Sequence, residues 1–267
     1  MEWLYVTAVI PVKDYCMYGF LGGPRPLRLG QLVNLHKAAT IPLVVGLMHN
    51  YDNFTPSAYV YLACHGSLAI AWLLKSRIMP DRIFSERMTL PSSVLCLGVF
   101  GGYWAAGFII VSERVESSNL VLCLMIMLHS IGLLCLLCTD TQKFYQLRAR
   151  PGLITDGWLT WSRNTNYLGT FFVYLSYAIL AQHWIPYAWL AIMVAFSYLS
   201  SMVAKDISLR KKDGAEQYMQ QAWFFLPNVF GWSHQLLYAP VSVTPQVVPT
   251  TGPPLAEVAA SKAPATT

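Results

Sequence analysis

Long apolar runs, separated by short polar segments, occupy most of the 267-residue chain. Each of the longer runs approaches the roughly 20 residues that an α-helix needs to cross the hydrocarbon core of a bilayer. The weakest run is interrupted by Pro42 and ends at His49. The pattern predicts an all-α polytopic membrane protein with about six transmembrane helices, at residues 38–50, 57–75, 90–112, 119–138, 167–182 and 187–204.

Breaks in this pattern divide the chain into four expected regions. Residues 1–37 are mixed in polarity and predict a cytosolic segment, or a short interfacial helix, before the first crossing. Residues 38–138 predict four membrane helices, and residues 139–238 combine a polar segment with a hairpin of two further helices. Residues 239–267 are rich in Pro, Thr, Val and Ala, with almost no charge. Such a tail lacks the pattern needed to build a core, so we expect it to be disordered.

The composition supports the membrane interpretation. Hydrophobic residues make up 55% of the chain and charged residues 12%, against roughly 25% charged in soluble domains. With six helices and a cytosolic N-terminus, seventeen of the 18 Lys and Arg residues fall on the cytosolic side, and only Arg114 falls on the other. This asymmetry follows the positive-inside rule. It predicts that both termini are cytosolic, and that the net charge of +5 reflects topology rather than binding to nucleic acid.

The six cysteines do not form a pattern typical of a metal site or of a disulfide framework. Four of them lie inside apolar runs, where a thiol usually acts as a small hydrophobic side chain. Cys135 and Cys138 have the spacing of a redox pair, but they close a helical run and lack a second pair of ligands. We therefore expect structural roles, and no metal, for Cys16, Cys64, Cys96, Cys123, Cys135 and Cys138.

The polar segment at residues 157–169 is rich in functional groups for a connection between two membrane helices. It contains an arginine, two asparagines, two tryptophans and a tyrosine, and it begins and ends with glycine. Arginine offers a planar fork of donors for phosphate or carboxylate, and glycine lets the backbone approach a ligand closely. The segment fits a ligand site, and it also fits an interfacial aromatic belt anchored by one arginine.

The segment has the pattern Gly-Trp-x4-Arg-x-x-Asn-Tyr-x-Gly, which resembles the C-terminal signature of delta-14 sterol reductases and steroid 5-alpha-reductases. It is more distantly similar to isoprenylcysteine and phospholipid methyltransferases. Residues 140–143 and 205–227 resemble the segments that flank this signature in the reductases. The resemblance covers about residues 140–230. It implies a membrane enzyme of the endoplasmic reticulum, or another internal membrane, that binds NADPH at residues 139–238 on the cytosolic side.

The resemblance also implies roles for single residues. Phosphates require fixed cations, an aromatic face suits a flat ring, and a carboxylate pairs with ribose hydroxyls. For the basic residues 143, 205 and 210–212, attraction to anionic lipid headgroups is an alternative, and for residues 210–212 we favour it. The implied cofactor-binding residues are Lys143 and Arg163 at phosphate or ribose, Asn166 and Tyr167 at the nicotinamide end, Asp206 at the adenosine ribose, and Trp158 and Tyr218 as walls.

The chain departs from the pattern of these relatives at several positions. Thr170 stands where they have Asp or Glu directly after the second glycine, and Ile207 stands where they often have a second acid. Asn164 and Thr165 occupy the places of a His and a Pro. These departures leave open a non-catalytic membrane scaffold of the same fold. Methyl transfer from S-adenosylmethionine is also open, although the Arg-His-Pro and paired glutamates of the methyltransferases are absent.

Ionisable residues in the middle of the predicted helices supply candidates for catalysis. His65 shares a helical face with Tyr61 and Trp72, and His129 lies in the fourth predicted helix. Such residues usually face the bundle interior and mark a pathway or site, although each histidine could equally bond a neighbouring helix. Reducing a polarised double bond requires a proton as well as a hydride. The candidate catalytic residues are His65, His129 and Tyr167, with Tyr174 and Tyr177 as further proton donors.

Together these features predict NADPH-dependent reduction of a carbon–carbon double bond in a sterol, steroid or other lipid. The alternatives are an S-adenosylmethionine-dependent methyltransferase acting on a lipid or prenylated substrate, and the scaffold without catalysis. The expected partners are the bilayer and a lipid substrate. The shape of the cavity decides which lipid is bound, so the sequence leaves the substrate open, and it leaves the oligomeric state open as well.

Overall fold

The computed structural model describes residues 2–227, and the predicted disorder of residues 239–267 concerns a part of the chain outside them. The described chain is mostly helical, as predicted. Its α-helices are α1 (Glu2–Leu4), α2 (Ile10–Asp14), α3 (Leu29–Asn50), α4 (Pro56–Ile78), α5 (Leu90–Gly101), α6 (Ala105–Ser112), α7 (Asn119–Ala149), α8 (Thr165–Ala181), α9 (Trp184–Met193), α10 (Leu199–Leu209) and α11 (Ala215–Gln221).

Shorter elements connect or interrupt these helices. The wide π-type turns are η1 (Tyr5–Val9), η2 (Tyr15–Gly19) and η6 (Val194–Tyr198). The tight 3-10 turns are η3 (Arg82–Ser85), η4 (Gly102–Trp104) and η5 (Gly157–Leu159). Two short strands, β1 (Leu27–Arg28) and β2 (Arg87–Met88), pair antiparallel and join the start of α3 to the start of α5.

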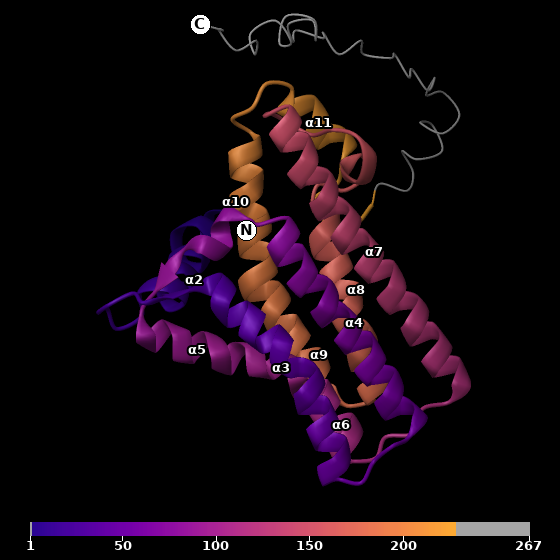
Figure 1. Ribbon diagram of the computed structural model, residues 1–267. Coiled ribbons are helices and arrows are strands. Elements are labelled where there is room, and N and C mark those ends of the chain that lie inside the picture. Colours follow the sequence, from indigo (N-terminus) through magenta and orange to yellow (C-terminus); the bar gives the residue numbers. More distant parts are fainter. Residues whose placement is uncertain (1, 228–267) are drawn as a thin grey trace, which may run out of the picture. The chain divides into compact units, whose positions relative to one another are not determined.

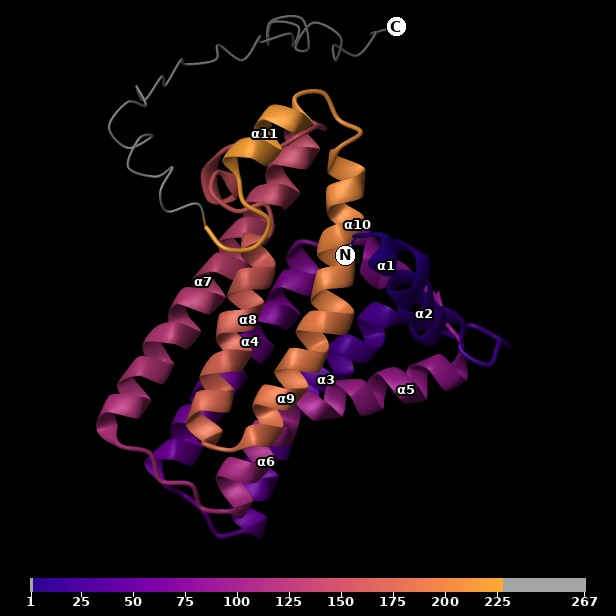
Figure 2. The same cartoon turned by 180° about the vertical axis from the view of Figure 1, so that it is seen from behind.

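Four stretches of residues 2–227 are long and apolar enough to cross a membrane. They are Pro56–Ile78, Leu90–Ser112, Asn119–Ala149 and Trp184–Leu209. The other two predicted crossings, 38–50 and 167–182, coincide with α3 and α8, which are helices but are not among these four. Figure 1 and Figure 2 show α3, α4, α7, α8 and the α9–α10 pair side by side in one bundle.

The predicted crossing at 90–112 is not one straight helix. It divides into α5 and α6 at the turn η4, and α5 leaves the bundle at a steep angle (Figure 1). A Gly101-Gly102 pair weakens the helix there, because glycine has low helix propensity and pairs of small residues are common at kinks. The Trp189 ring also packs where a Gly102 Cβ would lie, so the bend brings α9 against the turn.

Two predicted region boundaries fall inside helices. The boundary at 37/38 lies within α3, which already begins at Leu29 because Leu29 and Leu32 pack against Met88 in a small buried cluster. The boundary at 138/139 lies within α7, which continues to Ala149. Proline at position 151 disfavours the helical conformation for Arg150, and the helix ends there.

A glycine pair sets the closest approach between two helices of the bundle. A Cβ on Gly169 of α8 would lie 2.5 Å from the Gly132 carbonyl oxygen of α7, and a Cβ on Gly132 would lie 2.7 Å from the Gly169 carbonyl oxygen. Small residues at such a crossing let two backbones touch, as is common between helices in membranes. The sequence suggested that Gly169 lets the backbone approach a ligand. In the structure, Gly169 instead lets the backbone of α8 approach the backbone of α7.

The expected hairpin between the last two apolar runs is present. Gln182 ends α8 in the left-handed conformation, with φ 49°. The His183 side chain then accepts a hydrogen bond from the backbone N–H of Ile185, at 3.2 Å, and so caps α9. This turn carries the chain back along α8, so the segment before α8 and the segment after α10 meet at the same end of the bundle (Figure 1).

Candidate functional site

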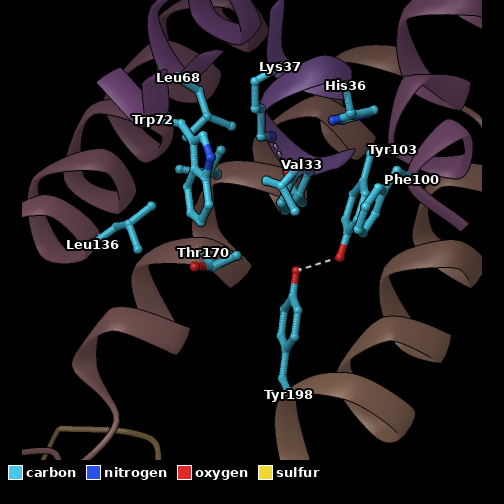
Figure 3. A pocket seen from close by; sticks show the side chains of 12 residues that line it. Val33, His36, Lys37, Leu68, Trp72, Phe100, Tyr103, Leu136, Thr170 and Tyr198 are labelled. Carbon is cyan, nitrogen blue, oxygen red and sulfur yellow. Dashed lines mark hydrogen bonds between the residues drawn. The ribbon is translucent and has the colours of Figure 1, made fainter. Parts of the chain in front are cut away.

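A cavity of about 160 Å³ lies inside the bundle, between α3, α4, α7, α8 and the turns η4 and η6. Figure 3 shows its side chains converging from these elements. Most of them are apolar or aromatic, and the polar groups come from α3, α8 and the two turns. The lining residues are Val33, His36, Lys37, Leu68, Trp72, Phe100, Tyr103, Leu136, Thr170, Val173, Tyr174 and Tyr198.

Lys37 is the one Lys, Arg, Asp or Glu residue in this lining. It is 6% exposed, and its Nζ donates a hydrogen bond to the Tyr174 hydroxyl at 3.0 Å. The ammonium also lies 5.7 Å from the centre of the Tyr174 ring. The sequence placed Lys37 in a cytosolic segment; that prediction was wrong, because α3 begins two turns earlier and carries the side chain into the bundle.

Two further tyrosines, both missed at the level of sequence, line the same cavity. The Tyr103 and Tyr198 hydroxyls are 3.2 Å apart and hydrogen-bonded (Figure 3). The Tyr103 ring lies 4.3 Å from the Tyr174 ring, centre to centre. Tyr103 follows the Gly101-Gly102 pair, so the glycine-rich stretch was the signal that could have directed attention to it.

Thr170 also lines the cavity, although it donates its hydroxyl to the Asn166 carbonyl oxygen one turn earlier in α8, at 2.9 Å. Asn166 is a predicted cofactor residue one turn before Thr170 in this helix. Its side-chain Oδ1 is buried and has no hydrogen-bond partner among the described residues. An unpaired buried acceptor has a free-energy cost, so this atom is available for an N–H donor of a ligand.

The predicted histidines lie beside the cavity and do not line it. His65 is fully buried on α4, and its Nδ1 is 2.7 Å from the Tyr61 hydroxyl. The Tyr177 ring stacks between His65 and His129, at centroid distances of 4.9 Å and 5.6 Å. The His129 Nε2 is 3.3 Å from the Ser67 hydroxyl. Structure thus brings His65 and His129 together, as two members of one buried aromatic stack.

Of the predicted proton donors, only Tyr174 faces the cavity. Tyr174 contacts the stack through Tyr177, whose ring centre is 5.8 Å away, and through His65 at 6.4 Å. Tyr167 lies three residues, or just under one helical turn, before Thr170 in α8 and packs on Tyr198, with ring centres 5.9 Å apart. It is not among the residues that line the cavity.

A charged groove of about 440 Å³ opens where α4 ends, next to the last turns of α7. Lys75 forms an ion pair with Asp140 there, and the Lys143 ammonium is 4.0 Å from the same carboxylate. The groove contains four basic side chains and two acidic ones, so its formal charge is +2 (4 minus 2). These are Lys75, Arg82, Lys143 and Arg148, with Asp81 and Asp140.

A smaller depression of about 200 Å³ lies between the groove and the cavity. It shares Trp72 with the cavity, and it shares Lys75, Met79, Pro80 and Asp81 with the groove. The Trp72 indole N–H donates to Asn34 Oδ1 at 3.2 Å, and the Lys75 ammonium lies 4.9 Å from the Trp72 ring centre. Trp72 is therefore the partition between a polar entrance and the apolar interior.

Arg163, the arginine of the resemblance motif, makes contacts within the protein. It is buried and forms a two-pronged ion pair with Asp206, with Nε and Nη2 donating at 3.2 Å and 2.8 Å. Its Nη1 donates to the carbonyl oxygens of Met219 and Ala222. Four of the five guanidinium N–H groups are used in this way. Arg163 and Asp206 clamp α10 and the segment after α11 onto the start of α8.

The flanking residues of the motif reinforce this clamp. The Gln142 Oε1 accepts from the Trp158 backbone N–H at 2.8 Å, and the Gln142 Nε2 donates to the Asp156 carbonyl oxygen at 2.9 Å. Tyr218 donates its hydroxyl to the Leu159 carbonyl oxygen at 2.8 Å, and burial raises the pKa of this phenol to about 12. Gly157, with φ +59°, leaves the space that the Gln142 amide fills.

The predicted cofactor residues therefore divide into three groups. Lys143 lines the charged groove, whereas Asn166 and Tyr167 lie in the first turn of α8 and line neither the groove nor the cavity. Trp158, Arg163, Asp206 and Tyr218 belong to the clamp, and none of the four lines the cavity or the groove. Their proposed contacts with a cofactor stay predictions, whereas their contacts with one another are present in the structure.

The cysteines and possible metal ligands add no further centre to the described part of the chain. All six cysteines are free thiols. Within residues 2–227, no group of three His, Cys, Asp or Glu side chains is arranged to hold a metal ion.

Fold and site define a mostly helical protein with a charged groove at one end of the bundle and a separate, mostly apolar cavity between its helices. Comparison with models of known protein families gives no match, and comparison with curated proteins gives none either. The similarity of residues 140–230 to sterol and steroid reductases thus rests on the motif residues alone.

Proposed function

We propose that the chain is a membrane-embedded reductase that uses NADPH to reduce a carbon–carbon double bond in a lipid held in the central cavity. The observation that carries the proposal is a neighbouring pair of sites: a cationic groove and an aromatic cavity lie on either side of a depression that shares lining residues with both. A dinucleotide needs fixed cations for its phosphates and an enclosed, mostly apolar space for its reactive ring. A lipid needs the apolar space next to that ring.

The described residues fit such a cofactor at both ends. Lys143, Arg82 and Arg148 would hold the phosphates, and a groove of charge +2 attracts a polyanion. The unpaired Asn166 Oδ1 would accept an N–H from the nicotinamide carboxamide. When bound, the nicotinamide supplies a hydride. Sulfonium-bearing S-adenosylmethionine is itself cationic at the reactive centre, so the groove favours it less.

Tyr174 is the residue that we propose to hold the proton. Its hydroxyl faces the cavity and accepts the hydrogen bond from Lys37. A phenol that gives up its proton becomes an anion, and the nearby ammonium stabilises that anion. Lys37 and Tyr174 thus replace the predicted pair His65 and His129 as the acid of the proposed site, because neither histidine reaches the cavity.

The proposed setting is an internal membrane, with the groove on the cytosolic side. The groove is lined by the end of α4 and the last turns of α7. In Figure 1 the loop between α6 and α7, which contains Arg114, lies at the other end of the bundle from the C-terminal ends of α7 and α10. The basic-residue asymmetry of the sequence supports this orientation. Crossing by α3 and α8, which would complete the six helices, is part of the same proposal.

Two tyrosines of α8, Tyr174 and Tyr177, test the proposed reaction. Tyr174→Phe keeps the ring packing and removes the proton, so NADPH oxidation driven by an added lipid should fall by about 100-fold or more. NADPH binding to the purified protein in detergent should be unchanged. Tyr177→Phe is the control on the same helix, because Tyr177 lies one turn further along α8, is buried, and has a hydroxyl without a partner among the described residues. It should keep activity.

The outcome also separates the alternatives. Tight binding of S-adenosylmethionine with no binding of NADPH would assign the chain to the methyltransferases. If neither NADPH nor S-adenosylmethionine binds, the non-catalytic scaffold is the alternative that remains. Full activity in Tyr174→Phe would remove this tyrosine from the reaction.

A further inference from the structure

The Lys37 ammonium is buried inside the bundle without a carboxylate partner. Among the ion pairs of residues 2–227, none involves Lys37, and its one hydrogen bond is to the neutral Tyr174 hydroxyl. The other polar groups of the cavity are an imidazole, three hydroxyls besides Tyr174 and an indole, all of which are uncharged. Within the described chain, the cavity is therefore a cation-lined space without an anion.

Other basic side chains with little exposure have carbonyl or carboxylate acceptors within the protein. Lys205 donates to the Arg163 carbonyl oxygen and to Asn164 Oδ1. Lys75 pairs with Asp140, and Arg163 pairs with Asp206. Both side chains lie at the groove end of the bundle, nearer to water than Lys37. A buried cation without a counter-ion is costly, because desolvation is not offset by Coulomb attraction. The cavity that Lys37 faces is where the missing negative charge can be supplied.

We infer that the ligand of this cavity is a lipid with a carboxylate headgroup, bound with its carboxylate on Lys37. A single ammonium matches a single negative charge, whereas a phosphate monoester carries more charge than this lining neutralises. Val33, Leu68, Leu136 and Val173 give the hydrocarbon an apolar surface. Figure 3 shows Lys37 pointing from α3 into the space between Trp72 and Tyr103.

This inference names the class of lipid that the proposed reductase would bind. It rests on the proposed function only in taking the bound lipid to be the substrate. A carboxylate on Lys37 lies next to the Tyr174 hydroxyl, because the ammonium and this hydroxyl are 3.0 Å apart. The double bond to be reduced is then close to the carboxyl end of the lipid. The cavity of about 160 Å³ holds only that end, and the rest of the chain extends along the bundle.

The test compares one lipid with its uncharged forms. Purified full-length protein in an uncharged detergent is titrated with hexadecanoate, with its methyl ester and with hexadecanol, and ligand-induced thermal stabilisation is followed by tryptophan fluorescence. Hexadecanoate should bind about tenfold or more tightly than the ester, the effect of one charge-assisted hydrogen bond. Lys37→Met should abolish the preference and leave ester binding unchanged. The control Lys211→Met, at an exposed lysine, should keep the preference.

Folding does not obscure this comparison. Methionine matches lysine in length, and replacing a buried unpaired charge by an apolar side chain is often neutral or stabilising, so the ligand-free Lys37→Met protein should melt no lower than the wild type. Equal binding of hexadecanoate and its ester, a preference that survives in Lys37→Met, or tighter binding of hexadecyl phosphate would each overturn the inference. Displacement of hexadecanoate by NADPH in direct competition would also overturn it, because the anion would then be the cofactor.

Failure of the proposed function gives a different result. If the protein does not bind NADPH but shows a Lys37-dependent preference for hexadecanoate, the carboxylate site stands and the reductase proposal falls. If NADPH binds and hexadecanoate shows no preference, the reductase proposal stands and the headgroup assignment falls.

Discussion

At the scale of single residues, Arg163 has the densest set of polar contacts in the clamp, and its geometry leads to a prediction. Lysine keeps the charge but cannot reproduce the two-pronged pairing with Asp206 or the bonds to Met219 and Ala222. Arg163→Lys should lower the free energy of unfolding by about 3 kcal/mol, because buried acceptors lose their donors. Thermal unfolding in detergent, followed by tryptophan fluorescence, measures the change.

Arg210→Lys is the control for this substitution. Arg210 also makes a two-pronged ion pair, with Glu2, but both side chains are about half exposed and screened by water. The melting temperature should hardly change. A normal melting temperature in Arg163→Lys, together with weaker NADPH binding, would show that Arg163 contacts the cofactor and does not act mainly as a clamp.

From the sequence, residue type indicated which side chains make unusual polar contacts. It did not indicate the partners of those contacts. The motif correctly singled out Arg163, Asp206, Gln142 and Gly157 as polar or conformational exceptions in an apolar chain. Their partners are other parts of the protein, and nothing in a residue's identity distinguishes an internal carboxylate from a bound phosphate. Lys37 was missed for the opposite reason: it was counted as a cytosolic charge, because its burial depends on where α3 begins.

At the scale of elements, the crossing of α7 and α8 depends on the glycine pair Gly132 and Gly169. An added Cβ at Gly169 would meet backbone atoms of α7, which cannot rotate away as a side chain can. Gly169→Ala should therefore separate the helices and destabilise the protein by about 1–3 kcal/mol, the usual cost of overpacking. The same unfolding measurement would record the loss.

Gly98→Ala in α5 provides the matched control for this crossing. A Cβ at Gly98 meets no atom within 4 Å. Alanine has a higher helix propensity than glycine, by about 1 kcal/mol, so this variant should be as stable as the wild type or more stable. Equal stability of Gly169→Ala and the wild type would mean that the two helices do not approach as closely as the structure indicates.

Hydropathy located most of the helices. It missed the bend between α5 and α6 and the early start of α3, which depend on contacts between elements. Apolar runs gave the positions of α4, α7 and the α9–α10 pair, since those helices need only length and composition. The bend between α5 and α6 had a visible signal in Gly101-Gly102, but its direction comes from the packing of Trp189. The early start of α3 depends on pairing of β1 with β2, which joins residues 27–28 to residues 87–88 and leaves no periodic pattern.

At the scale of the whole molecule, the groove charge predicts how the proposed cofactor binds. NADPH should bind more weakly as salt is added, because ions screen its attraction to a cationic surface. Lys143→Glu changes the formal groove charge from +2 to 0 and should weaken binding by about tenfold or more, roughly 1.4 kcal/mol. Equilibrium titration of the purified protein, followed by NADPH fluorescence, measures both effects.

Lys211→Glu makes the same charge change outside the groove. Lys211 is exposed and does not line the cavity, the depression or the groove. Its effect on NADPH affinity should be small and should disappear at moderate salt. Equal losses in the two variants would mean that the net charge of the protein, and not the groove, attracts the cofactor.

The orientation in the membrane links the cofactor supply to the fold, because the groove must face the compartment that contains NADPH. Thr155 is exposed in the loop between α7 and η5, and Glu116 is exposed in the loop between α6 and α7. Figure 1 shows these two loops at opposite ends of the bundle. In a cysteine-free background, an impermeant thiol reagent applied from the cytosolic side should label Thr155→Cys and leave Glu116→Cys unlabelled until the membrane is opened. The basic residues around the groove keep this end cytosolic, since the positive-inside rule orients a bundle by its short loops. Labelling of Glu116→Cys from the cytosol, with Thr155→Cys protected, would place the groove away from NADPH and would contradict both the orientation and the proposed reductase.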